Sequence, residues 1–359
     1  VSSGKLIEYS RFNSTIVPSR NVFVWLPTGY STKERYDVLY MHDGQMLFDA
    51  NTTWNKQEWG IDEIVGKLLS EKKMEPCIVV GIASIPETRY EDYFPQKALN
   101  YLPDEQLPED ISFNADNYLR FLVEEVKPFI DKEYSTNKSV EHTFVMGSSM
   151  GGLISLYALC EYPEVFGGAA CMSTHVPMIL SKELSKEKAD QWSRAFRNYL
   201  DENLPTANSR IIYMDRGDAT LDAYYPPYQD KLDKLMRKKG WKGPMWVSKV
   251  FPGAAHTEVD WNKRLDNPLL FLLGTDRKDC ICDKKDTDMS PDDYLISKFK
   301  DADIVLLAED HGVKENLDFV KKMIPKLYAN GIYMLGMEFG AYEDQKQLDS
   351  LINAPRSVS

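Results

Sequence analysis

Residues 144–152, FVMGSSMGG, contain the pattern Gly-x-Ser-x-Gly centred on Ser149. An apolar run stops at Gly147, and Gly151 follows two residues after the serine. In a sharp turn between a strand and a helix, side chains at these two positions would collide, so glycine is expected at both. Such a turn lifts the central hydroxyl clear of the sheet and points the N-terminus of the next helix at it. The pattern therefore makes Ser149 a candidate nucleophile.

The flanking residues decide whether the motif is meaningful, because any turn rich in glycine and serine can match it. Residues 143–146 are typical of a short buried strand, and residues 153–160 of an apolar helix. This context favours a reactive serine.

Strands and helices alternate over about 270 residues of the chain. We expect an antiparallel opening pair of strands at 6–13 and 21–26, and further strands at 36–41, 77–82, 143–146, 166–172, 211–214 and 246–251. Helices are expected at 58–69, 115–134, 153–160, 221–239 and 259–273, with a long loop at 83–114. This order predicts an α/β fold, with a mostly parallel central sheet flanked by helices on both faces.

Composition excludes several classes of protein. The 359 residues carry a net charge of −12, which disfavours a nucleic-acid partner. No apolar run reaches the roughly 20 residues of a membrane span. The five cysteines do not form a disulfide framework, and Cys280-Ile281-Cys282 lacks a second pair at zinc spacing. We expect neither a metal nor an organic cofactor.

The sequence starts at Val1 without a visible signal peptide, so we expect the natural start to be missing. We favour a periplasmic or secreted location over a cytoplasmic one.

A serine nucleophile needs a base, and the chain offers five histidines: His42, His142, His175, His256 and His311. In hydrolases with this turn the order along the chain is serine, acid, histidine. Two of the histidines precede Ser149, and His175 leaves no room for a strand that carries the acid. His256 lies between the last expected strand and the last expected helix of the α/β region, so it is the candidate base.

The acid is expected after the preceding strand, in IIYMDRGDATLDAYY. Asp215 lies at the strand end, where a structural role is expected. Asp218 and Asp222 both follow in the loop, and a triad requires only a carboxylate that reaches the far imidazole nitrogen. The residues alone leave both open.

Four segments in this order resemble the esterase D-like family of α/β-hydrolases: VLYMHDGQMLFD, GSSMGG, DRGDATLDAYYPPYQ and GAAHTEVDWNKRL. The family includes feruloyl and acetyl-xylan esterases, enterochelin esterases and S-formylglutathione hydrolase. The resemblance implies an α/β-hydrolase fold. It also favours Asp222 over Asp218, because the related subgroup reads G-T-x-T-L-D and Leu221-Asp222 is kept here, whereas Gly-Asp replaces Gly-Thr.

An oxyanion hole needs two N–H donors. The first is expected to be the backbone of Met150, and the resemblance points to Gln45 for the second, with His42 and Asp43 bracing the loop. Aromatic-rich segments at 84–95 and 224–228 are expected to form the rim of the cleft. The residues expected to contact substrate are Trp54, Arg89, Tyr93, Tyr224 and Tyr225, and Trp59 is a further candidate.

The composition changes after Gly274. We expect an esterase domain at 1–274, a linker at 275–295 and a partial second domain at 296–359. The last segment is expected to form a short βαβ-like fragment, with strands at 302–312 and 331–339 around a helix at 316–330. It resembles the start of erythromycin esterase-like and haem-uptake ChaN-like proteins, which makes Glu309 and His311 candidates without a complete site; Glu338 lies in the second strand.

Together these observations predict a serine carboxylic-ester hydrolase with a Ser149-Asp222-His256 triad and an acyl-enzyme intermediate. A carbohydrate-linked acyl ester, such as acetyl or feruloyl xylan, is the expected substrate. The alternatives are a siderophore trilactone esterase, a thioesterase similar to S-formylglutathione hydrolase, a non-catalytic binding module, and a domain auxiliary to a missing C-terminal hydrolase or haem- or metal-binding domain.

Overall fold

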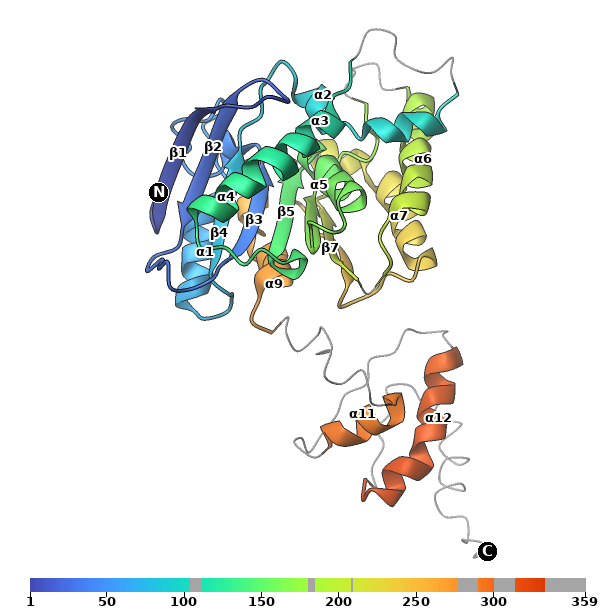
Figure 1. Ribbon diagram of the computed structural model, residues 1–359. Helices are drawn as coiled ribbons and strands as arrows, with labels where there is room; N and C mark the ends of the chain where they lie inside the picture. The colour runs from blue at the N-terminus through green and yellow to red at the C-terminus, as the bar shows by residue number, and fades with distance from the viewer. Residues whose placement is uncertain (104–111, 180–184, 208, 277–289, 300–313, 333–359) are drawn as a thin grey trace, which may run out of the picture. The chain divides into compact units, whose positions relative to one another are not determined.

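The computed structural model describes residues 1–103, 112–179, 185–207, 209–276, 290–299 and 314–332 (Figure 1). The chain divides into two compact units, Val1–Ile281 and Cys282–Ser359. The first unit carries the sheet and all the candidate triad residues.

The first unit is built on an eight-stranded sheet with the order β1-β2-β4-β3-β5-β6-β7-β8. The strands are β1 Lys5–Phe12, β2 Arg20–Leu26, β3 Asp37–His42, β4 Cys77–Ile82, β5 Thr143–Ser148, β6 Gly168–Met172, β7 Ile211–Arg216 and β8 Trp246–Val250. The pairs β1–β2 and β2–β4 are antiparallel, and all the others are parallel. The eight strands predicted between residues 6 and 251, including the antiparallel opening pair, are confirmed.

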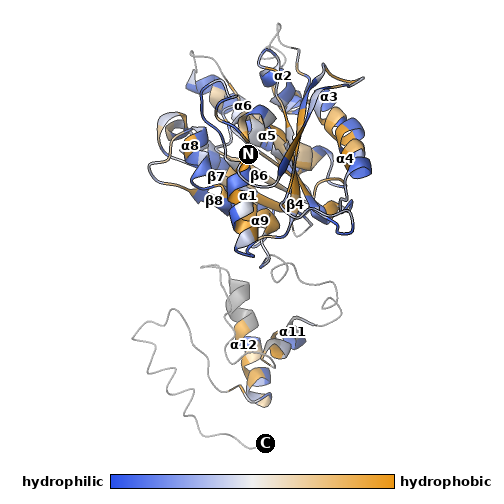
Figure 2. Cartoon of the chain, turned by 90° about the vertical axis from the view of Figure 1, so that its left-hand side faces the viewer, coloured by the Kyte–Doolittle hydropathy of each residue, from blue (hydrophilic) through white to orange (hydrophobic). Residues whose placement is uncertain are grey.

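Helices cover both faces of this sheet. The bounds of the helical elements are η1 Gly44–Met46, α1 Ile61–Ser70, α2 Arg89–Tyr93, η2 Gln96–Tyr101, α3 Ala115–Arg120, η4 Phe121–Val126, α4 Lys127–Glu133, η5 Val140–His142, α5 Met150–Glu161, α6 Lys186–Asn203, η6 Thr220–Tyr224, α7 Pro226–Lys238, α8 Glu258–Asn262 and α9 Asp266–Leu273. One core cluster joins the sheet to α3, α5, α6 and α7, and the other joins its opposite face to α1 and α9. Figure 2 shows that hydrophobic residues concentrate in the sheet around β4, while the surrounding helices carry hydrophilic residues as well.

Several elements differ from those expected. The predicted helix at 115–134 is continuous but contains a π-helical segment, η4, between α3 and α4. The predicted loop at 83–114 contains the short helices α2 and η2. The helix α6 was not predicted, although Ser185 caps it by accepting a hydrogen bond from the N–H of Lys188. The predicted helix at 221–239 begins as the 3-10 turn η6 and continues as α7 from Pro226, since proline suits the first turn of a helix.

The second unit contains two described helices, α11 Pro291–Lys298 and α12 Lys314–Ala329. Leu295, Met323 and Leu327 form its small apolar cluster. The helix α11 begins inside the segment 275–295 predicted as a linker, and the domain boundaries stay a prediction. The two predicted strands, with Glu309, His311 and Glu338, lie outside the described residues, so the second domain stays a prediction. No helix in the described part of the chain is long and apolar enough to cross a membrane.

The direction of the strands fixes where a site can form. β3, β5, β6, β7 and β8 are parallel, so their carboxyl ends meet at one edge of the sheet. The segments that follow these strands carry every candidate for the triad and for the oxyanion hole, and open α/β sheets bind their ligands at this edge.

Candidate active site

Ser149 occupies the turn between β5 and α5 with φ 56° and ψ −121°. This conformation is unfavourable for a residue with a side chain, and such strain is concentrated at functional sites. A Cβ at Gly147 would lie 2.7 Å from the carbonyl carbon of Gly151, so Gly147 has no room for a side chain. At Gly151 an added Cβ would come no closer than 3.5 Å to His42 Cβ, an ordinary contact, so the collision expected at both positions occurs only at Gly147. The Ser149 N–H donates to the carbonyl oxygen of Met172 at 2.9 Å, so the neighbouring strand β6 holds the turn.

His256 and Asp222 form a close pair. The His256 Nδ1 lies 2.6 Å from the Asp222 Oδ1. The His256 N–H also donates to the Thr220 hydroxyl at 2.8 Å, which ties the loop after β8 to the segment after β7. Asp218, the alternative acid, accepts instead from the N–H of Gly253 at 2.6 Å. The structure thus brings Asp222, and not Asp218, to the histidine side chain.

The second carboxylate oxygen of Asp222 is also fully engaged. Oδ2 accepts from the Ser173 hydroxyl at 2.5 Å and from the Gly217 N–H at 2.6 Å. Burial alone would raise the pKa of Asp222, but the bonds from His256, Ser173 and Gly217 outweigh it and hold the pKa below the ordinary 3.8. Asp222 is therefore a fixed anion at neutral pH.

A buried network behind Asp222 orients Ser173. The Ser173 hydroxyl accepts from Trp261 Nε1 at 3.0 Å and from Arg264 Nη2 at 2.8 Å, so its own proton is directed to Asp222. Arg264 also contacts the buried carboxylate of Asp215 at 3.2 Å. Sequence reasoning recognised Asp215 as structural but missed Ser173, Trp261 and Arg264. The one available signal was that a buried aspartate needs a cation, and Arg264 lies in the GAAHTEVDWNKRL segment that also carries His256.

We expect Arg264→Met to destabilise the protein by about 3–5 kcal/mol, because it leaves the Asp215 carboxylate buried without its cation. Urea unfolding of both proteins measures this difference. Lys263→Met is the matched control, since Lys263 is the adjacent residue and its ion pair with Asp260 is solvent-exposed. Equal changes in the two variants would contradict a structural role for the buried pair.

Tyr225 lies beside the pair rather than on the rim of a cleft, which corrects the sequence prediction. Its side chain is buried, and its ring centroid lies 5.7 Å from that of His256 at nearly a right angle. Its hydroxyl lies 2.8 Å from His175 Nδ1. Burial raises the pKa of the Tyr225 phenol well above its usual value, and a hydrogen bond with the Ser149 side chain opposes that rise. Tyr225 therefore lies between two histidines, His256 and His175.

The loop after β3 approaches the N-terminus of α5. A Cβ at Gly151 would lie 3.6 Å from Asp43 Oδ2, so Asp43 is close to the start of α5. A Cβ at Gly44 would lie 2.5 Å from the backbone of Gly81, so the loop can pack on β4 only with glycine at position 44. The side chain of Gln45 exchanges two hydrogen bonds with Ser84, at 2.8 and 3.0 Å. The first N–H groups of α5 have no partner within the helix, and Met150 is its first residue.

Arg89 and Tyr93 brace this loop. Arg89 binds both carboxylate oxygens of Asp43 at 2.7 Å. Tyr93 is fully buried, and its hydroxyl accepts from the Asp43 N–H at 3.1 Å. The prediction that Tyr93 forms part of the rim is therefore wrong. His42 is also buried and contacts the Tyr118 hydroxyl at 2.8 Å, in keeping with the bracing role expected for it.

Two of the predicted rim aromatics are exposed. Trp54 is 84% exposed and Tyr224 is 71% exposed. Tyr224 directly precedes the buried Tyr225. Asn55, the neighbour of Trp54, donates a hydrogen bond at 2.8 Å to Glu258, and Glu258 follows His256 by two residues. Trp59, by contrast, is buried, with its ring centroid 5.5 Å from that of Trp261.

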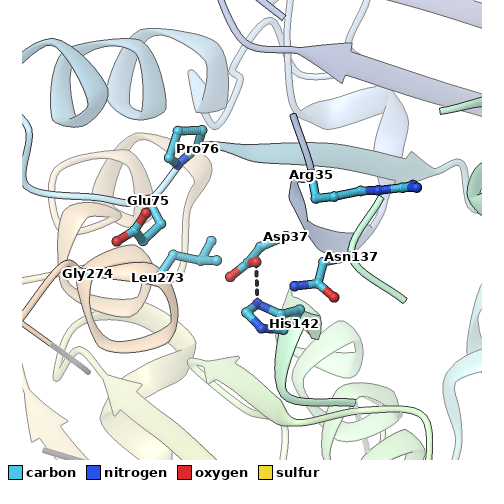
Figure 3. A pocket seen from close by; sticks show the side chains of 8 residues that line it. All are labelled: Arg35, Asp37, Glu75, Pro76, Asn137, His142, Leu273 and Gly274. Atoms are coloured by element: carbon cyan, nitrogen blue, oxygen red, sulfur yellow. Dashed lines mark hydrogen bonds and ion pairs between the residues drawn. The ribbon is translucent and has the colours of Figure 1, made fainter. Parts of the chain in front are cut away.

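A pocket of about 150 Å³ lies at the other end of the sheet. Figure 3 shows Asp37 and His142 joined across it, with Glu75 on the far side. His142 precedes β5 whereas Ser149 follows it, so this pocket is separate from the candidate site. Within the described residues, no group of three or more His, Cys, Asp or Glu side chains is placed to hold a metal ion.

Comparison with known proteins agrees with this geometry. The profile of the esterase family described as "Putative esterase" matches residues 14–272. The chain belongs to this esterase family. The sheet and elbow described above are those of the α/β-hydrolase fold.

Individual relatives are distant. The chain is 27% identical to the uncharacterised protein YjcH of Bacillus subtilis over 48% of its length, and the match spans 63% of YjcH, just under two thirds. It is 26% identical to the ferri-bacillibactin esterase BesA of the same organism, over 45% of this chain and 57% of BesA. Among solved structures, a ferulic acid esterase superimposes with a TM-score of 0.54 at 19% identity, covering 75% of this chain and 97% of that one.

Proposed function

We propose that this esterase hydrolyses carbohydrate-linked acyl esters through an acyl-enzyme intermediate on Ser149, with His256 as the base and Asp222 as the acid. The observation that carries the proposal is the strained Ser149 turn, at the same edge of the sheet as the hydrogen-bonded pair of His256 and Asp222. These residues follow β5, β7 and β8 in the order expected of such a triad.

In the first half-reaction the Ser149 Oγ attacks the ester carbonyl carbon, and His256 Nε2 takes the serine proton. Nδ1 donates to Asp222, so Nε2 is the free basic nitrogen. The N–H groups of Met150 and Gln45 stabilise the negative charge on the carbonyl oxygen. His256 then gives the proton to the departing alcohol, which leaves an acyl ester on Ser149.

In the second half-reaction His256 removes a proton from water, whose oxygen attacks the acyl carbon. The tetrahedral intermediate collapses, Ser149 leaves with the proton from His256, and the carboxylic acid departs. The buried anion of Asp222 stabilises the imidazolium formed in both halves, because its hydrogen bonds fix it in place before the charge develops.

The exposed aromatics support a carbohydrate-linked substrate. Trp54 and Tyr224 present open ring faces on loops that lead to His256 and Tyr225, and such faces suit the apolar side of a sugar ring. The related proteins include both kinds of esterase, a ferulic acid esterase and the ferri-bacillibactin esterase BesA, so the choice of substrate rests on the exposed aromatics. The net charge of −12 gives no particular support to a ferric-siderophore substrate.

A substrate panel tests this choice: acetylated and feruloylated xylo-oligosaccharides, a catecholate trilactone and S-formylglutathione. We expect the highest kcat/KM for a xylo-oligosaccharide ester. Trp54→Ala and Tyr224→Ala should each raise KM for that ester about 3- to 10-fold, the value of one aromatic stacking contact, with a smaller effect on p-nitrophenyl acetate. Tyr224→Phe keeps the ring and should behave like the parent. Preference for the trilactone or the formyl thioester would contradict the carbohydrate assignment and leave the triad proposal intact.

A further inference from the structure

A bidentate ion pair lies beside the start of α5 and has no part in the triad. Arg89 Nε and Nη2 donate to Asp43 Oδ1 and Oδ2, each at 2.7 Å. Both side chains are largely covered, with 30% of Arg89 and 13% of Asp43 exposed. Burial alone would raise the pKa of Asp43, but the Arg89 guanidinium holds it below the ordinary 3.8, so the pair is ionic at neutral pH.

Asp43 has an unusual backbone conformation, with φ 56° and ψ 45°. This left-handed region is unfavourable for most residues with a side chain, although aspartate and asparagine tolerate it. It turns the chain from β3 into η1, where the Met46 N–H donates to the Asp43 carbonyl oxygen at 2.8 Å. Gln45, the proposed oxyanion donor, lies inside this turn, so the direction of its N–H depends on the conformation of Asp43.

The segment after β4 holds this turn in place. Arg89 binds the Asp43 carboxylate, and the Tyr93 hydroxyl accepts from the Asp43 N–H at 3.1 Å. Ser84 exchanges two hydrogen bonds with the Gln45 side chain, at 2.8 and 3.0 Å. Arg89 and Tyr93 both belong to α2, so one short helix fixes the carboxylate and the backbone of Asp43 together.

The position of the Asp43 carboxylate makes its charge a problem for catalysis. A Cβ at Gly151 would lie 3.6 Å from Oδ2, and Gly151 directly follows Met150, the other proposed oxyanion donor. An unpaired carboxylate here would repel the negative charge that develops on the ester carbonyl oxygen and would compete with it for the same N–H groups. The Arg89 Nη2 bound to this carboxylate oxygen offsets that charge.

We propose that Arg89 is a positioning residue that neutralises the Asp43 carboxylate beside the oxyanion hole and fixes the turn that carries the Gln45 N–H. The inference rests on the proposed roles of Ser149, Met150 and Gln45. It gives Arg89 a role different from the direct substrate contact that the sequence predicted.

The two members of the pair should differ when each is removed. Arg89→Met leaves a bare carboxylate, so it should lower kcat for p-nitrophenyl acetate about 10- to 100-fold with little change in KM, because the charge acts on the transition state and not on the substrate. Asp43→Asn removes the charge and tolerates the left-handed conformation, so it should cost less than about fivefold. In the double variant, Asp43→Asn should restore most of the kcat that Arg89→Met loses.

Inhibition by phenylboronic acid gives a second readout. The Ser149 Oγ adds to the boron, the serine proton passes to His256, and the tetrahedral anion that forms occupies the oxyanion hole as a transition-state analogue. We expect the Ki of Arg89→Met to rise by the same factor as its kcat/KM falls. Lys127→Met is the matched control, because Lys127 forms a partly buried ion pair with Asp131 on α4, and it should leave kcat and Ki unchanged. Urea unfolding checks that each variant is folded under the assay conditions.

The outcomes separate this inference from the proposed function. A parent that is neither inhibited by phenylboronic acid nor labelled at Ser149 by a fluorophosphonate would overturn the nucleophile assignment, and the inference with it. A reactive parent in which Arg89→Met raises KM and leaves kcat unchanged would show that Arg89 contacts the substrate, and would overturn the inference alone. A loss of kcat that Asp43→Asn does not restore, or an equal loss in Lys127→Met, would do the same.

Discussion

Ser149→Ala should lower kcat by at least about 10³-fold while the protein folds normally, since removal of a serine nucleophile abolishes the covalent route. The reason is local. Ser149 occupies the strained position of the turn between β5 and α5, at φ 56°. Alanine has the same backbone requirements there, so the change removes the hydroxyl and little else. Hydrolysis of p-nitrophenyl acetate measures the loss.

Ser148→Ala provides the matched control. Ser148 is the neighbouring residue, but it is the last residue of β5 and is paired with Met172 of β6 in the sheet. We expect its variant to keep kcat near that of the parent. Comparable activity in Ser149→Ala and the parent would contradict the assignment of the nucleophile, as would an equal loss in Ser148→Ala.

Asp222→Asn should lower kcat at least a hundredfold, and the structure explains how. The Ser173 hydroxyl and the Gly217 N–H both donate to Oδ2, so the amide oxygen of the asparagine must take that position. The amide N–H₂ then faces His256 Nδ1 and forces it to accept, which moves the imidazole proton to Nε2. A base protonated on the nitrogen that faces the serine cannot take its proton; in a well-studied serine protease the equivalent change costs about 10⁴ in kcat.

Asp218→Asn is the control for the acid. Its carboxylate accepts from the Gly253 N–H, and an amide oxygen can replace it in that bond. We expect less than about a threefold change in kcat, an effect smaller than that of one hydrogen bond. Should Asp218→Asn be the crippled variant and Asp222→Asn retain near-parent turnover, the acid would be Asp218.

The sheet was predictable because its strands are short apolar runs separated by turn residues. Such short runs, apolar on both faces, are typical of the central strands of a parallel sheet covered by helices. The helix α6 was harder to recognise: six of its 18 residues are buried, but three of these are alanine or serine, and its first turn is rich in lysine and glutamate. The π-helical segment η4 has no sequence signal that we recognise, since it changes the hydrogen bonding but not the apolar pattern of the helix.

The candidate site divides in the same way. Ser149 and His256 were found because a motif and a position in the chain define them. The contact of Asp222 with His256 depends on which of two loop aspartates turns inward, and only the geometry shows it. Aromatic composition predicted a rim, but Tyr93 and Tyr225 are buried because their hydroxyls find partners inside the fold. His175 was passed over because chain order excluded it from the triad, and its contact with the Tyr225 hydroxyl is visible only in the structure.

Labelling with a fluorophosphonate, followed by mass spectrometry of the modified peptide, tests the central claim most directly. The reagent phosphonylates a serine only when a base activates it, so the account predicts one label, on Ser149, in the parent protein and none in Ser149→Ala. His256→Gln should slow the labelling by at least a hundredfold, since the base that takes the serine proton is gone. An unlabelled parent, or a label on a different serine, would contradict the account.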